Sequence, residues 1–318
     1  MRYKITLKPL APFLFGGDNT FGVKGDEENG TYLVHSREFP QQSALQGMLK
    51  KEMMMQAGLL TRKLRGEWVD KQAKNEAKNL VGVEKFSILD SRLQEFGALK
   101  SISPLFLSKN GLAIIKKVDI DSFKYESGLL HGYNPKVNIY DNFVTVDNSK
   151  NYKSSDIFEE VQQIGIKKGG GDNAFFKKTS YLLKDDFLFT CFIESDFALE
   201  DSIVTLGADT SPFKMQVTQS NEVLKYEDKN GYLTLLSDAY ITIDIKEHCD
   251  FAITSEISYR NLVNKKHATK HSEFKKSSTV FLYEKGSLFI NPTPELIENL
   301  NNKNCQQLGY NIYSKGQN

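Results

Sequence analysis

The sequence lacks long hydrophobic runs, closely spaced cysteines and an excess of charge of one sign. No stretch of about 18 consecutive apolar residues occurs, which argues against a membrane-spanning helix. The first residues, MRYKITLKPL, lack the apolar core of a signal peptide, so we expect a cytoplasmic protein without membrane contacts. Cys191, Cys249 and Cys305 lie far apart and lack CxxC spacing, which argues against a disulfide framework and a structural zinc site.

The overall charge is close to neutral. The 318 residues include 41 Lys and Arg against 40 Asp and Glu, for a formal net charge of +1. The chain is therefore not the strongly basic protein expected of a dedicated double-helix binder. Lysines nevertheless occur in adjacent pairs, and a pair of this kind, taken alone, usually marks a solvated surface. The pairs are Lys50–Lys51, Lys116–Lys117, Lys167–Lys168, Lys177–Lys178, Lys265–Lys266 and Lys275–Lys276.

Hydrophobic periodicity predicts strands and helices along the first two thirds of the chain. Tyr3, Ile5 and Leu7 alternate with polar or charged residues, which is typical of a half-buried strand. Residues 40–57 follow the pattern of an amphipathic helix, and the Asn-Gly pair at 110–111 suits a tight hairpin turn. Further patterns predict a polar helix over 61–82, two strands within 101–120, a short helix over 154–166 and a strand over 185–196.

The order strand, helix, hairpin, helix, strand is the βαββαβ unit of the ferredoxin-like fold. After residue 197 the pattern repeats with less regularity. Strands are expected within 202–217, 238–245, 278–290 and 306–314, and a helix over 293–302. We therefore predict an α+β protein of tandem ferredoxin-like (RRM-like, βαββαβ) domains with long loop insertions.

The predicted domains meet near residue 197. The N-terminal domain spans 1–197 and carries a helical insertion at 58–80. It also carries a thumb-like excursion at 119–155, where aliphatic residues are few and Asp, Asn, Lys and Tyr are frequent. The C-terminal domain spans 198–318.

A glycine-rich segment, GIKKGGGDNAFFKKTSYLL at 165–183, is the main candidate for a binding site. A phosphate-binding NTPase loop needs a glycine directly before Lys-Ser or Lys-Thr, and Phe176 stands at that place. GGGDNA does fit G-x-G-x-x-A, with Glu194 a suitable distance further on. The segment nevertheless lies in an antiparallel context without parallel strand-helix repeats, which argues against a dinucleotide fold.

Two other motifs resemble metal sites, but each lacks a residue that such a site needs. FGGDN at 15–19 resembles the Gly-Gly-Asp turn of palm-type polymerases, but Asn19 replaces the second acid needed for two metals. Gly16 and Gly17 are equally well explained as a turn. His267 and His271 are spaced as a helical metal pair, but Ala268 stands where a metalloprotease has its glutamate. We expect no metal and no cofactor.

Lysines, glycines and aromatic residues together favour RNA binding by the 165–178 loop. Glycines allow backbone amides to reach phosphate oxygens, lysines neutralise charge, and aromatic rings stack on unpaired bases. The alternative is a flexible hairpin whose phenylalanines alternate into the core. The candidate residues are Lys167, Lys168, Gly169, Gly170, Gly171, Phe175, Phe176, Lys177 and Lys178.

Several segments together resemble the RAMP superfamily of CRISPR proteins. The resemblance is greatest to the Cas-five-like third subunit of the Cmr module, the type III-B RNA-guided effector complex. FPQQSALQGMLKKEM resembles the family's Pro-x-x-Ser/Thr-x-x-Gly helix start, and ISPLFLSKNGLAIIKKVD its Gly-Pro-Phe hairpin. The other segments are LKPLAPFLFGG, QQIGIKKGGGDNAFFKKTSYLLKDDFLFTCFIE, TLGADTSPFKM, VFLYEKGSLF and LGYNIY.

The resemblance implies a non-catalytic subunit that grips the 5′ handle of a CRISPR RNA. It implies contacts with the large signalling subunit and the backbone RAMP subunits, in an assembly that holds target RNA. The alternative is a metal-independent RAMP endoribonuclease that processes CRISPR precursor RNA. In that case His35, shortly before the helix at 40–57, would act as general base on a 2′-hydroxyl.

Roles for individual residues follow from residue type, spacing and this resemblance. The helix start at Gln41, Gln42 and Ser43 would offer amides to a phosphate. The 125–155 excursion would act as a thumb that kinks the RNA, and the 260–276 loop would meet RNA or the large subunit. Further candidate RNA contacts are Gly16, Gly17, Arg37, Lys50, Lys51, Lys275 and Lys276.

Overall fold

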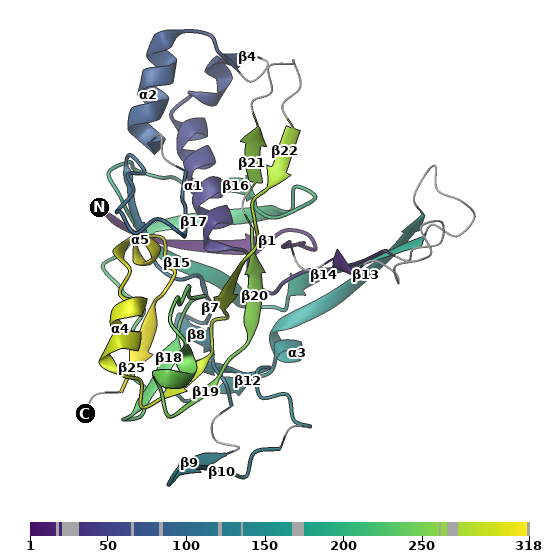
Figure 1. The fold of residues 1–318 in the computed structure, drawn as a ribbon. Helices are drawn as coiled ribbons and strands as arrows, with labels where there is room; N and C mark the ends of the chain where they lie inside the picture. The colour runs from purple at the N-terminus through teal and green to yellow at the C-terminus, as the bar shows by residue number, and fades with distance from the viewer. Residues whose placement is uncertain are drawn as a thin grey trace.

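The structure is a computed structural model of the chain (Figure 1). It describes residues 1–16, 19–20, 32–64, 67–82, 85–119, 123–134, 136–166, 175–260, 262–265 and 273–316. None of the helices within these ranges is long and apolar enough to cross a membrane.

One large antiparallel sheet forms the centre of the molecule, and β1 (Arg2–Pro9) lies between two of its longest strands. The predicted alternation of β1 is confirmed, because Tyr3, Ile5 and Leu7 are buried. The strand order is β12-β11-β8-β7-β15-β1-β17-β16, and β6 also pairs with β15. The other strands are β6 (Leu99–Ile102), β7 (Phe106–Lys109), β8 (Leu112–Lys116), β11 (Phe143–Thr145), β12 (Asn151–Tyr152), β15 (Phe187–Ser195), β16 (Ser202–Thr205) and β17 (Pro212–Gln219).

The predicted first helix is confirmed as α1 (Gln42–Gln56), which buries Leu45, Leu49 and Met53 in the core of the large sheet. The helix predicted over 61–82 is shorter. The observed helix is α2 (Lys71–Val81). It begins after Asp70, whose carboxylate accepts a hydrogen bond from the Ala73 amide at 2.6 Å. The residues before it form a 3-10 turn (Leu60–Arg62) and the short strands β4 (Lys63–Leu64) and β5 (Glu67–Trp68).

The hairpin predicted within 101–120 is confirmed as β7 and β8. Asn110 and Gly111 have φ values of 50° and 81° at its turn. The strand predicted over 185–196 is likewise confirmed as β15. By contrast, the helix predicted over 154–166 is wrong in most of its length. Only α3 (Ser154–Ile157) is helical, and β13 (Phe158–Ile166) follows it.

The strand β13 forms because it pairs along its whole length with β14 (Phe175–Leu183). This long hairpin projects from the body of the protein (Figure 1). In its outer half, from Phe176 to Thr179, β14 pairs in parallel with β3 (Tyr32–His35), which pairs in turn with β2 (Asn19–Thr20). Tertiary pairing has therefore replaced the second helix expected of the βαββαβ unit.

The predicted boundary at residue 197 does not separate two sheets. Strands β16 and β17 come after it, yet β17 pairs with β1 along seven positions. The C-terminal third instead contributes a smaller antiparallel sheet in the order β19-β24-β18-β25. Its elements are β18 (Tyr232–Leu235), β19 (Phe251–Ile253), β24 (Leu288–Ile290), β25 (Tyr313–Lys315), α4 (Pro294–Leu300), α5 (Lys303–Gln307) and a 3-10 turn at Ile245–Glu247.

Besides the short pair β4 and β5, three two-stranded ribbons complete the described structure. The predicted excursion at 119–155 contains only one of them, since its later residues return to the large sheet as β11 and β12. The α+β class is confirmed, whereas two complete βαββαβ units are not seen in the described ranges. The ribbons are β9 (Lys124–Glu126) with β10 (Leu129–His131), β20 (Glu256–Tyr259) with β23 (Val280–Tyr283), and β21 (Leu262–Lys265) with β22 (Glu273–Lys276).

The side chains of Lys116 and Lys117 are only 13% and 8% exposed, which corrects the expectation of a solvated surface. The Lys116 ammonium lies 3.1 Å from Glu38 and 2.8 Å from Glu284. Lys117 points the other way, because successive side chains of a strand alternate, and its ammonium lies 3.0 Å from Asp228. These ion pairs join the large sheet to the C-terminal third of the chain.

Candidate nucleic-acid interface

The described residues of the glycine-rich segment 165–183 lie in β13 and β14. Register runs without interruption from Phe158 opposite Leu183 to Ile166 opposite Phe175. Phe175 and Phe176 therefore belong to β14 and not to the loop in which they were predicted. Residues 167–174 lie outside the described ranges, and with them Lys167, Lys168, Gly169, Gly170 and Gly171.

Aromatic packing anchors the foot of the hairpin to the core. The Phe158 ring lies 5.6 Å from Tyr181 and 6.3 Å from Phe39, measured between centroids. The backbone of Tyr181 exchanges two hydrogen bonds with Phe13, at 2.8 and 3.0 Å. Four such rings at one end of a long two-stranded hairpin hold that end in place. The hairpin projects outward from this anchored foot (Figure 1).

Charge changes sign along the hairpin. Lys177 and Lys178 lie toward the tip, opposite Ile164 and Gln163, and the Ile164 side chain is 73% exposed. Lys178 makes an ion pair with Asp209 at 2.7 Å, which contributes little because Asp209 is exposed. Glu159 and Glu160 are exposed near the foot. The tip therefore suits a polyanion better than the foot does.

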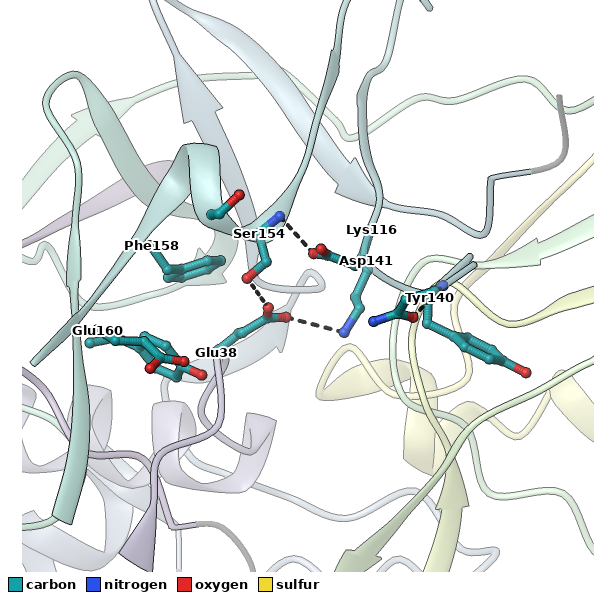
Figure 2. Close-up of a pocket in the computed structure, with 10 residues that line it drawn as sticks. Glu38, Lys116, Tyr140, Asp141, Ser154, Phe158 and Glu160 are labelled. Carbon is teal, nitrogen blue, oxygen red and sulfur yellow. Dashed lines mark hydrogen bonds and ion pairs between the residues drawn. The ribbon is translucent and has the colours of Figure 1, made fainter. Parts of the chain in front are cut away.

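A pocket of about 520 Å³ lies beside the foot of the hairpin (Figure 2). Charged, polar and aromatic side chains line it. The Ser154 amide donates to the Asp141 carboxylate at 2.7 Å, and the Ser154 hydroxyl donates to Glu38. These bonds hold both acids against the pocket wall. Its lining includes Glu38, Lys116, Asp141, Ser154, Glu160, Tyr140, Phe158 and Tyr181.

The electrostatics of this pocket are negative. Burial alone would lower the pKa of Lys116, but the charges of Glu38 and Glu284 outweigh it and raise the pKa. Burial raises the pKa of Tyr181, and the charges of Glu160 and Glu38 raise it further. Lys116 is already neutralised by two carboxylates, so the pocket is unsuited to a phosphate. The phosphates of a nucleic acid would instead meet the tip.

The start of α1 is an internal junction, which corrects the predicted phosphate site. The buried Gln42 side chain donates to the carbonyls of Ser103 at 2.8 Å and Leu308 at 2.9 Å. The Ser43 amide donates to the Tyr310 hydroxyl at 3.1 Å. Gln41 is the N-cap residue and makes no side-chain capping bond. The Ser43 amide and the Gln42 side chain are therefore occupied by the protein itself.

The structure does not gather the other predicted cations at the hairpin. Arg37 donates to the carbonyl and hydroxyl oxygens of Ser258 on β20, at 2.9 and 3.1 Å. Lys50 lies 4.4 Å from the Phe96 ring centroid, and Lys51 reaches Thr205 on β16 at 3.2 Å. The remaining predicted residues are Gly16, which is exposed, Gly17, which lies outside the described ranges, and Lys275 and Lys276, which lie in β22.

Residues proposed for catalysis or metal binding show no assembled site. His35 is exposed at the end of β3, opposite Thr179 of β14. Among the described residues, no group of three or more His, Cys, Asp or Glu could hold a metal ion. His267 and His271 lie outside the described ranges.

Sequence reasoning did not find the pocket at the foot of the hairpin. Glu38, Lys116, Asp141 and Ser154 come from four separate segments, and no spacing within one segment links them. The one local signal was Lys116, a lysine at the end of an otherwise apolar strand. Such a lysine needs a buried partner, which points to acids elsewhere in the chain.

Two solved structures share the fold over nearly the whole chain. A chain of the Type III-B Cmr-beta bound to cognate target RNA, solved by cryo-EM, is 15% identical with a TM-score of 0.56, covering 98% of this chain and 96% of that one. A chain of the same complex bound to cognate target RNA and AMPPnP, in state 1, is 15% identical with a TM-score of 0.55, covering 96% and 94%. No protein-family model and no curated protein sequence matches. The chain therefore has the fold of a subunit of a type III CRISPR effector complex.

Proposed function

We propose that the protein is a non-catalytic RNA-binding subunit of a type III-B CRISPR effector complex, and that the β13–β14 hairpin contacts the 5′ handle of the CRISPR RNA. The main support is the shared fold over 98% of the chain with a subunit of an RNA-bound Cmr-beta complex. In this role the protein also docks the large signalling subunit and the first backbone subunit.

The shape and charge of the hairpin support a contact with single-stranded RNA. Its foot is fixed by aromatic packing, and Lys177 and Lys178 lie toward its outer end. The sequence adds Lys167 and Lys168 and three glycines between the two strands. Lysines that neutralise phosphates and glycines that admit them closely suit a flexible single strand, whose contacts are mainly to the backbone.

Replacing all four hairpin lysines tests this proposal. The variant Lys167→Ala, Lys168→Ala, Lys177→Ala, Lys178→Ala should bind a fluorescent handle RNA at least about tenfold more weakly, measured by anisotropy at fixed salt. A matched control replaces four exposed lysines elsewhere, Lys71, Lys74, Lys246 and Lys303, with alanine. Equal affinities of the hairpin variant and this control would contradict the proposal.

A second candidate function is cleavage of precursor RNA with His35 as general base. It is favoured by one observation, the exposure of His35 on β3 next to β14. Incubating the protein with repeat RNA, with and without the change His35→Ala, separates the two functions. Our proposal predicts intact RNA in both samples, and cleavage that depends on His35 would support the nuclease.

A further inference from the structure

We propose that the outer face of the large sheet is a second RNA contact, separate from the hairpin, and that it takes one unpaired base in an apolar recess beside Phe192. This inference rests on the proposed function for the identity of the ligand as RNA. It uses no residue of the β13–β14 hairpin. The two contacts can therefore be tested independently.

The register of the strands defines this face. Tyr3, Ile5 and Leu7 of β1 point into the core, so Lys4, Thr6 and Lys8 point to the opposite side. On one side of β1, Lys8 lies opposite Lys214 and Thr6 opposite Gln216 of β17. Lys8, Lys214 and Gln216 are exposed. The strands run side by side across the middle of Figure 1.

On the other side of β1 the same face becomes aromatic. Phe192 of β15 lies directly opposite Lys4, and Thr190 lies opposite both Thr6 and Phe106 of β7. The Phe106 and Phe192 rings have centroids 5.5 Å apart at an angle of 39°. Phe106 is buried, with 4% of it exposed, and it supports the half-buried ring of Phe192 from the neighbouring strand. An aromatic ring on a sheet beside a row of lysines is a feature by which RRM-type sheets stack unpaired bases.

A recess of about 250 Å³ lies at these rings, and the half-buried Phe192 is the more accessible of the two. Leu112 and Val223 form part of its wall and are 41% and 49% exposed, so apolar surface faces the recess. The recess is also lined by Lys4, Glu222 and Lys225. The Lys4 ammonium lies 2.9 Å from the Glu222 carboxylate. The interior is therefore apolar and the surroundings are polar.

The charge around the recess selects a nucleic acid as the occupant. Lys4, Lys8, Lys214 and Lys225 lie on or beside this face, and of its acids Glu222 pairs with Lys4. At the far end of β1, Arg2 lies opposite Glu194 and the two balance each other. A planar apolar group flanked by negative charge matches this surface, and a nucleotide within a single strand has both features. Exposed lysines on the sheet would then contact the flanking phosphates.

Photo-crosslinking tests the proposal on the full chain. The probe is an eight-nucleotide oligouridylate with one 4-thiouridine, and the cross-linked peptides are identified by mass spectrometry. We expect cross-links in the peptides that contain Phe192, Leu112 or Val223. The four-lysine hairpin variant should lose cross-links to the hairpin and keep these, so that failure of the proposed hairpin contact is seen separately.

Two variants keep the test independent of folding. Phe192→Leu keeps an apolar side chain but removes the ring, and it should weaken cross-linking at this face about tenfold, the usual effect of losing one stacked base. Lys8→Glu with Lys214→Glu changes only exposed residues and should weaken it severalfold, whereas Lys246→Glu with Lys303→Glu should not. Cross-links confined to the hairpin, or absent altogether, would overturn the proposal. So would cross-links at this face that neither variant reduces.

Discussion

Two pairs of adjacent lysines, Lys116–Lys117 and Lys177–Lys178, differ in their burial and in the acids that they contact. Lys116–Lys117 ends a core strand, and each ammonium is held by acids from distant parts of the chain. Lys177–Lys178 lies on the projecting hairpin, where Lys178 makes an ion pair with the exposed Asp209. The first pair holds the fold together, and the second is available to a ligand. The acids around each pair, and not the lysines themselves, decide whether the pair is buried or exposed to a ligand.

Replacing Lys117 by methionine should have the largest effect on stability. Asp228 is fully buried and would lose its partner, and removing one member of a buried pair costs about 3–5 kcal/mol. Urea denaturation measures the loss. The double variant Lys117→Met, Asp228→Asn should recover part of it, because no buried charge remains. If Lys177→Met destabilised the protein as much, the contrast between the two pairs would be lost.

Alkaline pH should have the second largest effect on the free energy of unfolding. Burial raises the pKa of Cys191 and Cys305 to about 12, above their value in the unfolded chain. A raised pKa gives stability that is complete below the unfolded value of about 8.5 and is lost as pH rises toward the folded one. Each thiol should reduce the free energy of unfolding by about 1.4 kcal/mol per pH unit in that interval.

Urea denaturation at several pH values between 8 and 11 checks this dependence. Replacing Cys191 by alanine should make the slope of stability against pH shallower by the contribution of one thiol. A slope that does not change would show that ionisation of this thiol is not linked to unfolding.

Tyr310→Phe should have a smaller effect, on stability alone. The change removes the acceptor of the half-buried Ser43 amide, which costs about 1 kcal/mol. RNA affinity should stay the same, because the start of α1 is an internal junction. If the freed amide instead strengthened binding of handle RNA, α1 would be a phosphate site after all.

Lys178→Ala should have the smallest effect on stability, below about 1 kcal/mol, because its ion pair with Asp209 is exposed. Affinity for handle RNA should nevertheless fall severalfold. The matched change Asp209→Asn removes the same ion pair but keeps the lysine, so it should not weaken RNA binding. Anisotropy and thermal melting of both variants distinguish the two roles of Lys178.

Local patterns were enough to predict β1, α1, the β7–β8 hairpin and β15, because the burial periods of these elements are clear in the sequence. They failed at β13, where pairing with β14 overrides a weak helical pattern. They failed also at the domain boundary, since β17 crosses it to pair with β1. Sequence gave no means of seeing which distant strand would be the partner.

The candidate site was predictable in part for the same reason. The basic, glycine-rich segment was found because its residues are consecutive in the chain. The pocket beside Glu38 and the aromatic face at Phe106 and Phe192 depend on segments that only folding brings together. Arg37 and Gln42 were chosen by residue type, and both are used internally.

The salt dependence of RNA binding tests the central claim most directly. The slope of log affinity against log salt reports the number of phosphates contacted, at about 0.7 per phosphate for a single strand. Removing the four hairpin lysines should therefore make the slope shallower by between about 2 and 3, with the four-lysine control unchanged. An unchanged slope for the hairpin variant would contradict the claim that this hairpin holds the RNA backbone.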